Sequence, residues 1–83
     1  MITVLFFAGL REAVGTSSES LALPEGVGTI AALRDHLAAR GDQWQALATA
    51  KNLRAALNQD MVPLSAVLKD GDEVAFFPPV TGG

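Results

Sequence analysis

The chain has 83 residues, of which 49% are hydrophobic and 18% charged, with a net charge of -3 at neutral pH. This length predicts one small domain without room for a large internal active site, and the acidic balance argues against nucleic acid as a partner. The absence of cysteine excludes disulfides, zinc-thiolate sites, iron-sulfur ligation and a thiol nucleophile. The single histidine, His36, has no evident second ligand, and we expect it to be solvated and to have no role.

No apolar run approaches the length of a membrane span, and no basic leader precedes the apolar residues near the start. We therefore expect a cytoplasmic protein that makes no contact with a membrane. The basic side chains of Lys51, Arg54 and Lys69 are predicted to be solvated, although any of them could meet an acidic surface on a partner.

The first predicted element is a largely buried strand over residues 1–8, which are rich in β-branched and aromatic side chains. A short helical turn over residues 10–14 follows, and Gly15 closes it. Over residues 17–23, Leu21 and Leu23 lie on one side and Ser20 and Ala22 on the other, which predicts a half-buried strand that pairs with the first one. Residues 24–26 form the turn that ends it.

The main helix is predicted to begin after the N-cap Thr29, to run through Arg40 and to stop at Gly41. Its apolar stripe at helical spacing consists of Ile30, Leu33 and Leu37. A short second helix after Asp42 is predicted to turn three side chains inward, those of Trp44, Leu47 and Ala48.

Residues 53–58 alternate as a strand would, and a turn over residues 58–60 follows. A tight turn over residues 70–72 precedes the last strand, at residues 73–77. Two early strands, one main helix and two or more later strands predict an α+β fold of the β-grasp type, with a mixed sheet of four to five strands wrapped around one main helix. We assign residues 1–77 to this domain and residues 78–83 to a flexible, reactive C-terminal tail.

The parity of the strands predicts two different faces of the sheet. Val4 and Phe6 lie on one face, whereas Leu5 and Phe7 lie on the other with Thr3. In the last strand Phe77 belongs to the second set. One helix covers only one face, so we expect this second set to remain open as a docking surface. The alternative is that a loop or the segment around Trp44 covers it.

The tail carries the candidate chemistry. Pro78 and Pro79 stiffen it, and from Phe77 to Gly83 it reaches about 20 Å at ~3.3 Å per residue. Gly82 and Gly83 have no Cβ and fit a narrow channel. The only functional group at the tip is the carboxylate of Gly83, which becomes an acyl donor once an enzyme converts it into a mixed anhydride, for example with ATP. The alternative is a frayed terminus without function.

The closing run of residues 70–83, which ends in Phe77-Pro78-Pro79-Val80-Thr81-Gly82-Gly83, resembles the C-terminal signature of the small, sulfur-carrying subunits of molybdopterin synthase, a ubiquitin-like family. The segments Val4-Leu5-Phe6-Phe7-Ala8, Leu10-Arg11-Glu12 and Leu57-Asn58-Gln59 are similar to that family as well. The resemblance spans the whole chain.

The resemblance implies a carrier whose catalytic side chains are supplied by a partner. An activating enzyme of the ubiquitin-E1 type would use ATP to adenylate Gly83, and a sulfurtransferase would convert the adenylate into a thiocarboxylate, so that Gly83 becomes 1-thioglycine. The tail would then enter the large subunit, with Gly82 giving access, and donate sulfur to cyclic pyranopterin monophosphate to form molybdopterin. The family implies a heterotetramer and no tightly bound cofactor.

The same resemblance implies that Phe7, Met61 and Phe77 form the hydrophobic contact with the activating enzyme and the large subunit. Met61 stands where leucine is more usual. The tail residues that would contact the partner are Pro78, Pro79, Val80 and Thr81. Alternatives remain open: a carrier for thiamine, cysteine or tRNA thiolation, a protein modifier, or an interaction domain with an inert tail.

Overall fold

The computed structural model of the chain describes residues 1–50 and 52–78. The elements in chain order are β1 (Ile2–Phe6), α1 (Ala8–Val14), β2 (Ser18–Leu21), α2 (Ile30–Ala38), the 3-10 turn η1 (Asp42–Trp44), α3 (Gln45–Thr49), β3 (Arg54–Leu57), β4 (Asp60–Val62) and β5 (Glu73–Phe77). Within these two ranges, the helices are all too short to cross a membrane.

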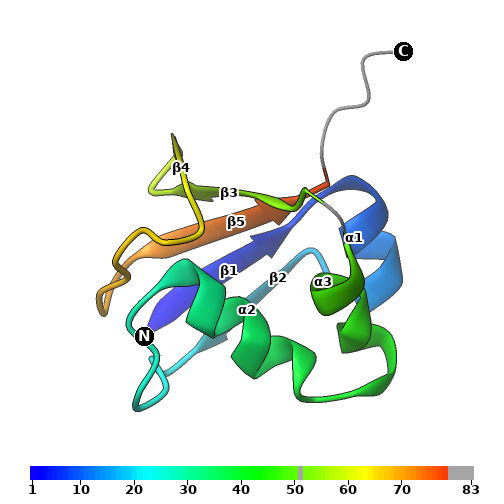
Figure 1. Cartoon of the computed structure of the whole chain (residues 1–83), viewed down its shortest axis with the longest axis horizontal. Helices are drawn as coiled ribbons and strands as arrows, with labels where there is room; N and C mark the ends of the chain where they lie inside the picture. Colours follow the sequence, from blue (N-terminus) through cyan, green and yellow to red (C-terminus); the bar gives the residue numbers. More distant parts are fainter. Residues whose placement is uncertain (51, 79–83) are drawn as a thin grey trace.

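The five strands form one mixed sheet in the order β2-β1-β5-β3-β4. β1 and β5 run parallel at its centre, and the other neighbours are antiparallel. α2 and α3 pack on one side of the sheet (Figure 1). The predicted β-grasp fold is therefore confirmed, and β4 is the fifth strand that the sequence pattern left open.

The core lies between this side of the sheet and α2. Alternate residues of the central strands point into it, so that Val4, Phe6 and Phe76 are almost fully buried. The rings of Phe6 and Phe76 stack with their centroids 6.4 Å apart. The predicted helical stripe is confirmed, because its three members, Ile30, Leu33 and Leu37, are each completely buried.

Both ends of α2 follow from local hydrogen bonds. The hydroxyl of Thr29 accepts a hydrogen bond from the backbone N–H of Ala32 at 3.1 Å, which confirms the predicted cap. The predicted end at Arg40 is wrong, since α2 ends at Ala38. The backbone N–H groups of Arg40 and Gly41 donate to carbonyls only three residues back, which tightens the last turn and ends the α-helical ladder.

Two further predictions need correction. Ala48 is exposed rather than turned inward. In the five-residue α3, Leu47 takes the position that faces the core, and its neighbour lies about 100° further around the helix axis. The first strand is also shorter than residues 1–8, because Ala8 adopts a positive φ of 52° and starts α1. Strands β2 and β3 likewise begin and end inside their predicted ranges, 17–23 and 53–58.

An ion pair ties the edge strand β2 to the end of α2. Both guanidinium nitrogens Nη1 and Nη2 of Arg40 donate to the carboxylate of Glu19, the first at 2.9 Å to Oε1. The same guanidinium lies 4.5 Å from the ring centroid of Trp44, whose ring meets Phe6 edge to face at 5.6 Å. Trp44 is half-buried and faces the core, as predicted.

This ion pair makes stability depend on pH. The hydrogen bond from Arg40 holds the pKa of Glu19 below its ordinary value of 4.5. A carboxyl with a lowered folded-state pKa stabilises the protein above its unfolded-state pKa and loses that effect as pH falls through the folded-state pKa. We expect Glu19→Gln to lower the free energy of unfolding by roughly 0.5–1 kcal/mol at pH 7, because both side chains stay partly exposed to water, 34% for Arg40 and 27% for Glu19.

The difference in the free energy of unfolding between wild type and Glu19→Gln should shrink as the pH drops below 4.5. There Glu19 takes up a proton and becomes neutral, as the glutamine of the variant already is. Urea unfolding at a series of pH values measures it. Glu12→Gln, which removes the same charge from an exposed position on α1, is the control. An equal loss of stability in both variants would contradict the role of the Arg40 pair.

The β3–β4 hairpin turns through two residues of positive φ, Asn58 at 50° and Gln59 at 75°. A two-residue loop of this shape favours Asn-Gly, because glycine has no Cβ to strain. We expect Gln59→Gly to raise the free energy of unfolding by roughly 1 kcal/mol. The measurement is a shift of the urea midpoint at constant m value. Gln59→Ala keeps the strained backbone and should bring no gain, so that stabilisation by both variants would refute this account.

Candidate functional site

The candidate site is the face of the sheet that points away from α2. Residues opposite each other in neighbouring strands share a face. Leu5 in β1 is paired with Ala75 in β5. Ala75 is in turn paired with Ala56 in β3, and Ala56 with Met61 in β4. These four side chains form an apolar row across the sheet, with Met61 58% exposed at one end.

A second row lies beside the first, at the end of the sheet where the chain leaves β5. Phe7 follows β1, Phe77 ends β5, and Arg54 of β3 is paired with Phe77. The rings of Phe7 and Phe77 meet edge to face, with their centroids 6.5 Å apart. Phe7 is 47% exposed, whereas Phe77 is half-buried. We call the two rows together the open face.

Local backbone geometry fixes Phe7 in this position. Its N–H donates to the carbonyl of Phe76 at 3.2 Å, which extends the parallel pairing by one residue. The next residue, Ala8, turns the chain away with its positive φ. The side chain of Phe7 therefore lies next to the end of β5.

The prediction that this set of residues remains open is confirmed over the described part of the chain, where no helix lies across it. The alternative that the Trp44 segment covers the face is wrong. Trp44 packs against Phe6, whose side chain points to the opposite side of the sheet, where α2 lies. The role of the open face in docking remains a prediction.

The tail begins at this corner of the sheet. Pro78 is half-buried and is the last residue that the structure describes. The predicted site residues Pro79, Val80, Thr81, Gly82 and Gly83 lie outside the described residues, and their roles stay predictions. What the structure adds is the starting point of the tail: the end of β5, beside Phe7 (Figure 1).

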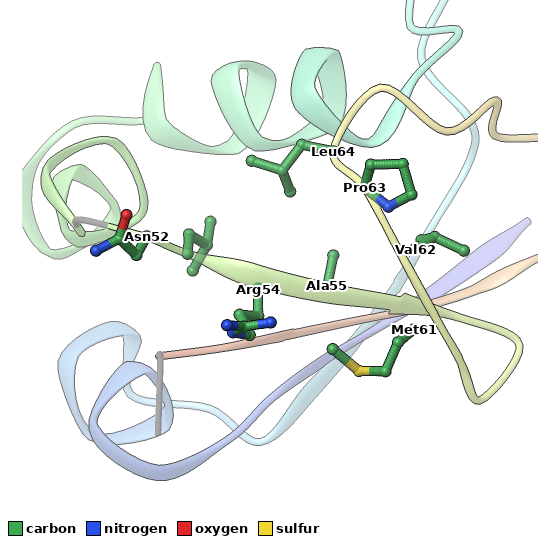
Figure 2. A pocket seen from close by; sticks show the side chains of 8 residues that line it. Asn52, Arg54, Ala55, Met61, Val62, Pro63 and Leu64 are labelled. Carbon is green, nitrogen blue, oxygen red and sulfur yellow. The ribbon is translucent and has the colours of Figure 1, made fainter. Parts of the chain in front are cut away.

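A hollow of about 390 Å³ adjoins the open face at its outer edge. Figure 2 shows its lining, which consists of Asn52, Leu53, Arg54, Ala55, Met61, Val62, Pro63 and Leu64. Sequence reasoning treated Arg54 as one of several solvated cations. Only the pairing register reveals that it stands next to Phe77 and shares this hollow with Met61.

The titratable groups with clearly shifted pKa values lie away from the open face. Besides the Glu19–Arg40 pair, the pKa of Asp72 is held below its ordinary range by hydrogen bonds from the Asn58 side chain and the Lys69 backbone N–H. These groups secure the turn before β5, at the opposite end of that strand from the tail. His36 is exposed, as predicted. Among the described residues no cluster of side chains is suited to hold a metal ion.

Known proteins of one family resemble this chain in sequence and in fold. Residues 4–83 match the model of the ThiS family. The chain is 52% identical to the molybdopterin synthase sulfur carrier subunit of Escherichia coli and 46% identical to that of Haemophilus influenzae, in both cases over 100% of each chain. Its fold is similar to a putative molybdopterin converting factor subunit 1 from Pyrococcus furiosus, with a TM-score of 0.76, 27% identity, and 95% and 97% of the two chains covered.

These similarities show both the structural class of the chain and its family. The five-stranded sheet around α2 is a ubiquitin-like β-grasp domain. The chain belongs to the ThiS family and, within it, to the molybdopterin synthase sulfur carrier subunits.

Proposed function

We propose that this chain is the sulfur carrier of a molybdopterin synthase and that its functional atom is the carbonyl carbon of Gly83. The observation that carries this proposal is the match to carrier subunits at 46–52% identity over the whole length of both chains. The chain is a small partner subunit of the synthase, and the catalytic side chains come from the large subunit.

The chemistry begins with a carboxylate that is a poor acyl donor. An E1-like adenylyltransferase binds ATP, an oxygen of the Gly83 carboxylate attacks the α-phosphorus, and pyrophosphate leaves. A sulfurtransferase then delivers sulfur at the sulfide oxidation level, from its persulfide and with a thiol as the reductant; this sulfur attacks the carbonyl carbon of Gly83, AMP leaves, and a thiocarboxylate remains. In the large subunit this sulfur attacks a carbon of cyclic pyranopterin monophosphate, and water then cleaves the resulting thioester and regenerates the Gly83 carboxylate. A second loaded carrier supplies the other sulfur of the molybdopterin dithiolene. The carrier itself holds no cofactor tightly, and the reactions belong in the cytoplasm.

The open face supports this proposal because a partner that binds it also lies next to the start of the tail. Phe7 and Phe77 touch at the corner from which the tail starts. A partner that covers these rings and Met61 therefore lies beside the residue from which the tail starts. Residues 1–77 act as the domain that is recognised, and residues 78–83 act as the part that reaches the active site.

The similarity to molybdopterin synthase sulfur carrier subunits at 46–52% identity favours the molybdopterin branch over carriers for thiamine, cysteine or tRNA thiolation and over a protein modifier. The β-grasp fold alone does not separate these functions. The interaction domain with an inert tail differs in its chemistry, since it predicts no modification of Gly83.

Intact-mass analysis tests the carrier role directly. After incubation with ATP, an E1-like enzyme and a sulfur source, we expect the chain to gain the mass difference between one sulfur and one oxygen, localised to Gly83. A chain with one alanine added after Gly83 is the control and should gain nothing, because its terminal carboxylate is displaced. If the enzyme is active on a known carrier and this chain stays unmodified, the carrier proposal is wrong.

Phe77→Glu tests the open face. The substitution places a charge in the middle of an apolar contact, and we expect it to weaken binding to the large subunit by about 100-fold, the size of effect typical of a central aromatic residue. Isothermal titration calorimetry measures it, and thermal unfolding verifies the fold. Val67→Glu, at a 64% exposed apolar residue outside the open face, is the matched control. An unchanged dissociation constant for Phe77→Glu would remove the open face from the interface.

A further inference from the structure

Arg54 stands at the border between the open face and the hollow. It is an exposed residue at the start of β3, directly opposite Phe77 in the sheet. Figure 2 shows its side chain and that of Met61 on the same side of β3. The guanidinium is thus the cation that β3 presents beside the last residue before the tail.

The surroundings of Arg54 are apolar. Its neighbours in the two rows are Phe77, Ala56 and Met61. The ion pairs within the described residues join Met1 to Asp70, Arg34 to Asp35 and Arg40 to Glu19, and none of them involves Arg54. The acidic residue that β5 presents on this face is Glu73, at the opposite end of the strand from Phe77.

The hollow beside Arg54 results from the end of the β3–β4 pairing. The two strands are paired from Leu57 back to Ala55, and the next position, opposite Arg54, is Pro63. There the chain departs from β3: the carbonyl of Pro63 accepts a hydrogen bond from the N–H of Ala66, and the carbonyl of Leu64 accepts one from the N–H of Ala31 in α2. The edge of β3 at Arg54 is therefore not paired with β4, and the side chains of Arg54 and Met61 both line the hollow.

We propose that Arg54 pairs with a carboxylate of the large subunit, whose side chain occupies the hollow between Arg54 and Met61. Charge complementarity supports this occupant, because the Arg54 guanidinium is exposed and makes no ion pair within residues 1–50 and 52–78. A guanidinium matches a carboxylate with two parallel hydrogen bonds, and arginine is enriched at interfaces. The proposal rests on the proposed function and names the chemistry of the partner at this corner.

The position of this pair determines what it does. Arg54 lies at the rim of the apolar contact and next to the root of the tail, so its pair orients the partner about the Phe7–Phe77 contact. Rim charges act mainly on the association rate and on the choice of partner. Arg54 is therefore a specificity residue for the complex, and it touches no reacting atom.

The test uses the full chain and the purified large subunit, with association and dissociation rates measured at low and raised salt. We expect Arg54→Gln to weaken binding by about 5- to 10-fold, mainly through slower association, and to reduce the salt dependence of that rate. Arg54→Lys should retain part of the affinity, and Arg54→Glu should bind more weakly than Arg54→Gln. The control is Lys69→Gln, which removes one charge from an exposed position ahead of β5 and should bind as the wild type does.

The outcomes separate the two proposals. If wild type neither binds the large subunit nor accepts sulfur, the proposed function fails. If wild type binds and Arg54→Gln shows the same rates and salt dependence, the Arg54 proposal is overturned while the function stands. Normal binding of Arg54→Gln to the large subunit, combined with slower adenylation, would also overturn it, because Arg54 would then serve the activating enzyme. Equal thermal unfolding of all variants excludes a folding defect.

Discussion

The parallel pairing of β1 with β5 is the constraint on which the rest of this structure depends. Parallel strands end at the same edge of a sheet, so the last residues of both strands meet there. Phe6 is paired with Phe76, and the next residue of each strand places Phe7 against Phe77. The root of the tail and the exposed ring of Phe7 are neighbours because of this pairing, although 70 positions separate the two phenylalanines in the sequence.

The same pairing gives the two sides of the sheet different surroundings. The alternation of side chains sends Phe6 and Phe76 into a core closed by α2, and it leaves Phe7 and Phe77 on the side without a helix. In the proposed function, the partner recognises the open face and receives the tail that starts beside it.

Much of this was readable from the sequence. The strand parity predicted which side would stay open, the Thr29 cap predicted the start of α2, and the closing run of residues predicted the family. The sequence was less informative about the short helix α3. Ala48 fits an inward stripe as well as Leu47 does, and only the length and placement of α3 decide that Leu47 is buried and Ala48 exposed.

The sequence by itself was enough to predict the family from the closing run of residues 70–83, and the comparisons confirm it. It also determined the alternation that separates core from open face, because side-chain parity is a local property of a strand. The tertiary structure alone decided which distant residues share the open face. Arg54 gains its significance from its place opposite Phe77 and beside the hollow that opens where the β3–β4 pairing ends. Strand order and register bring these residues together, and neither is encoded in any single segment.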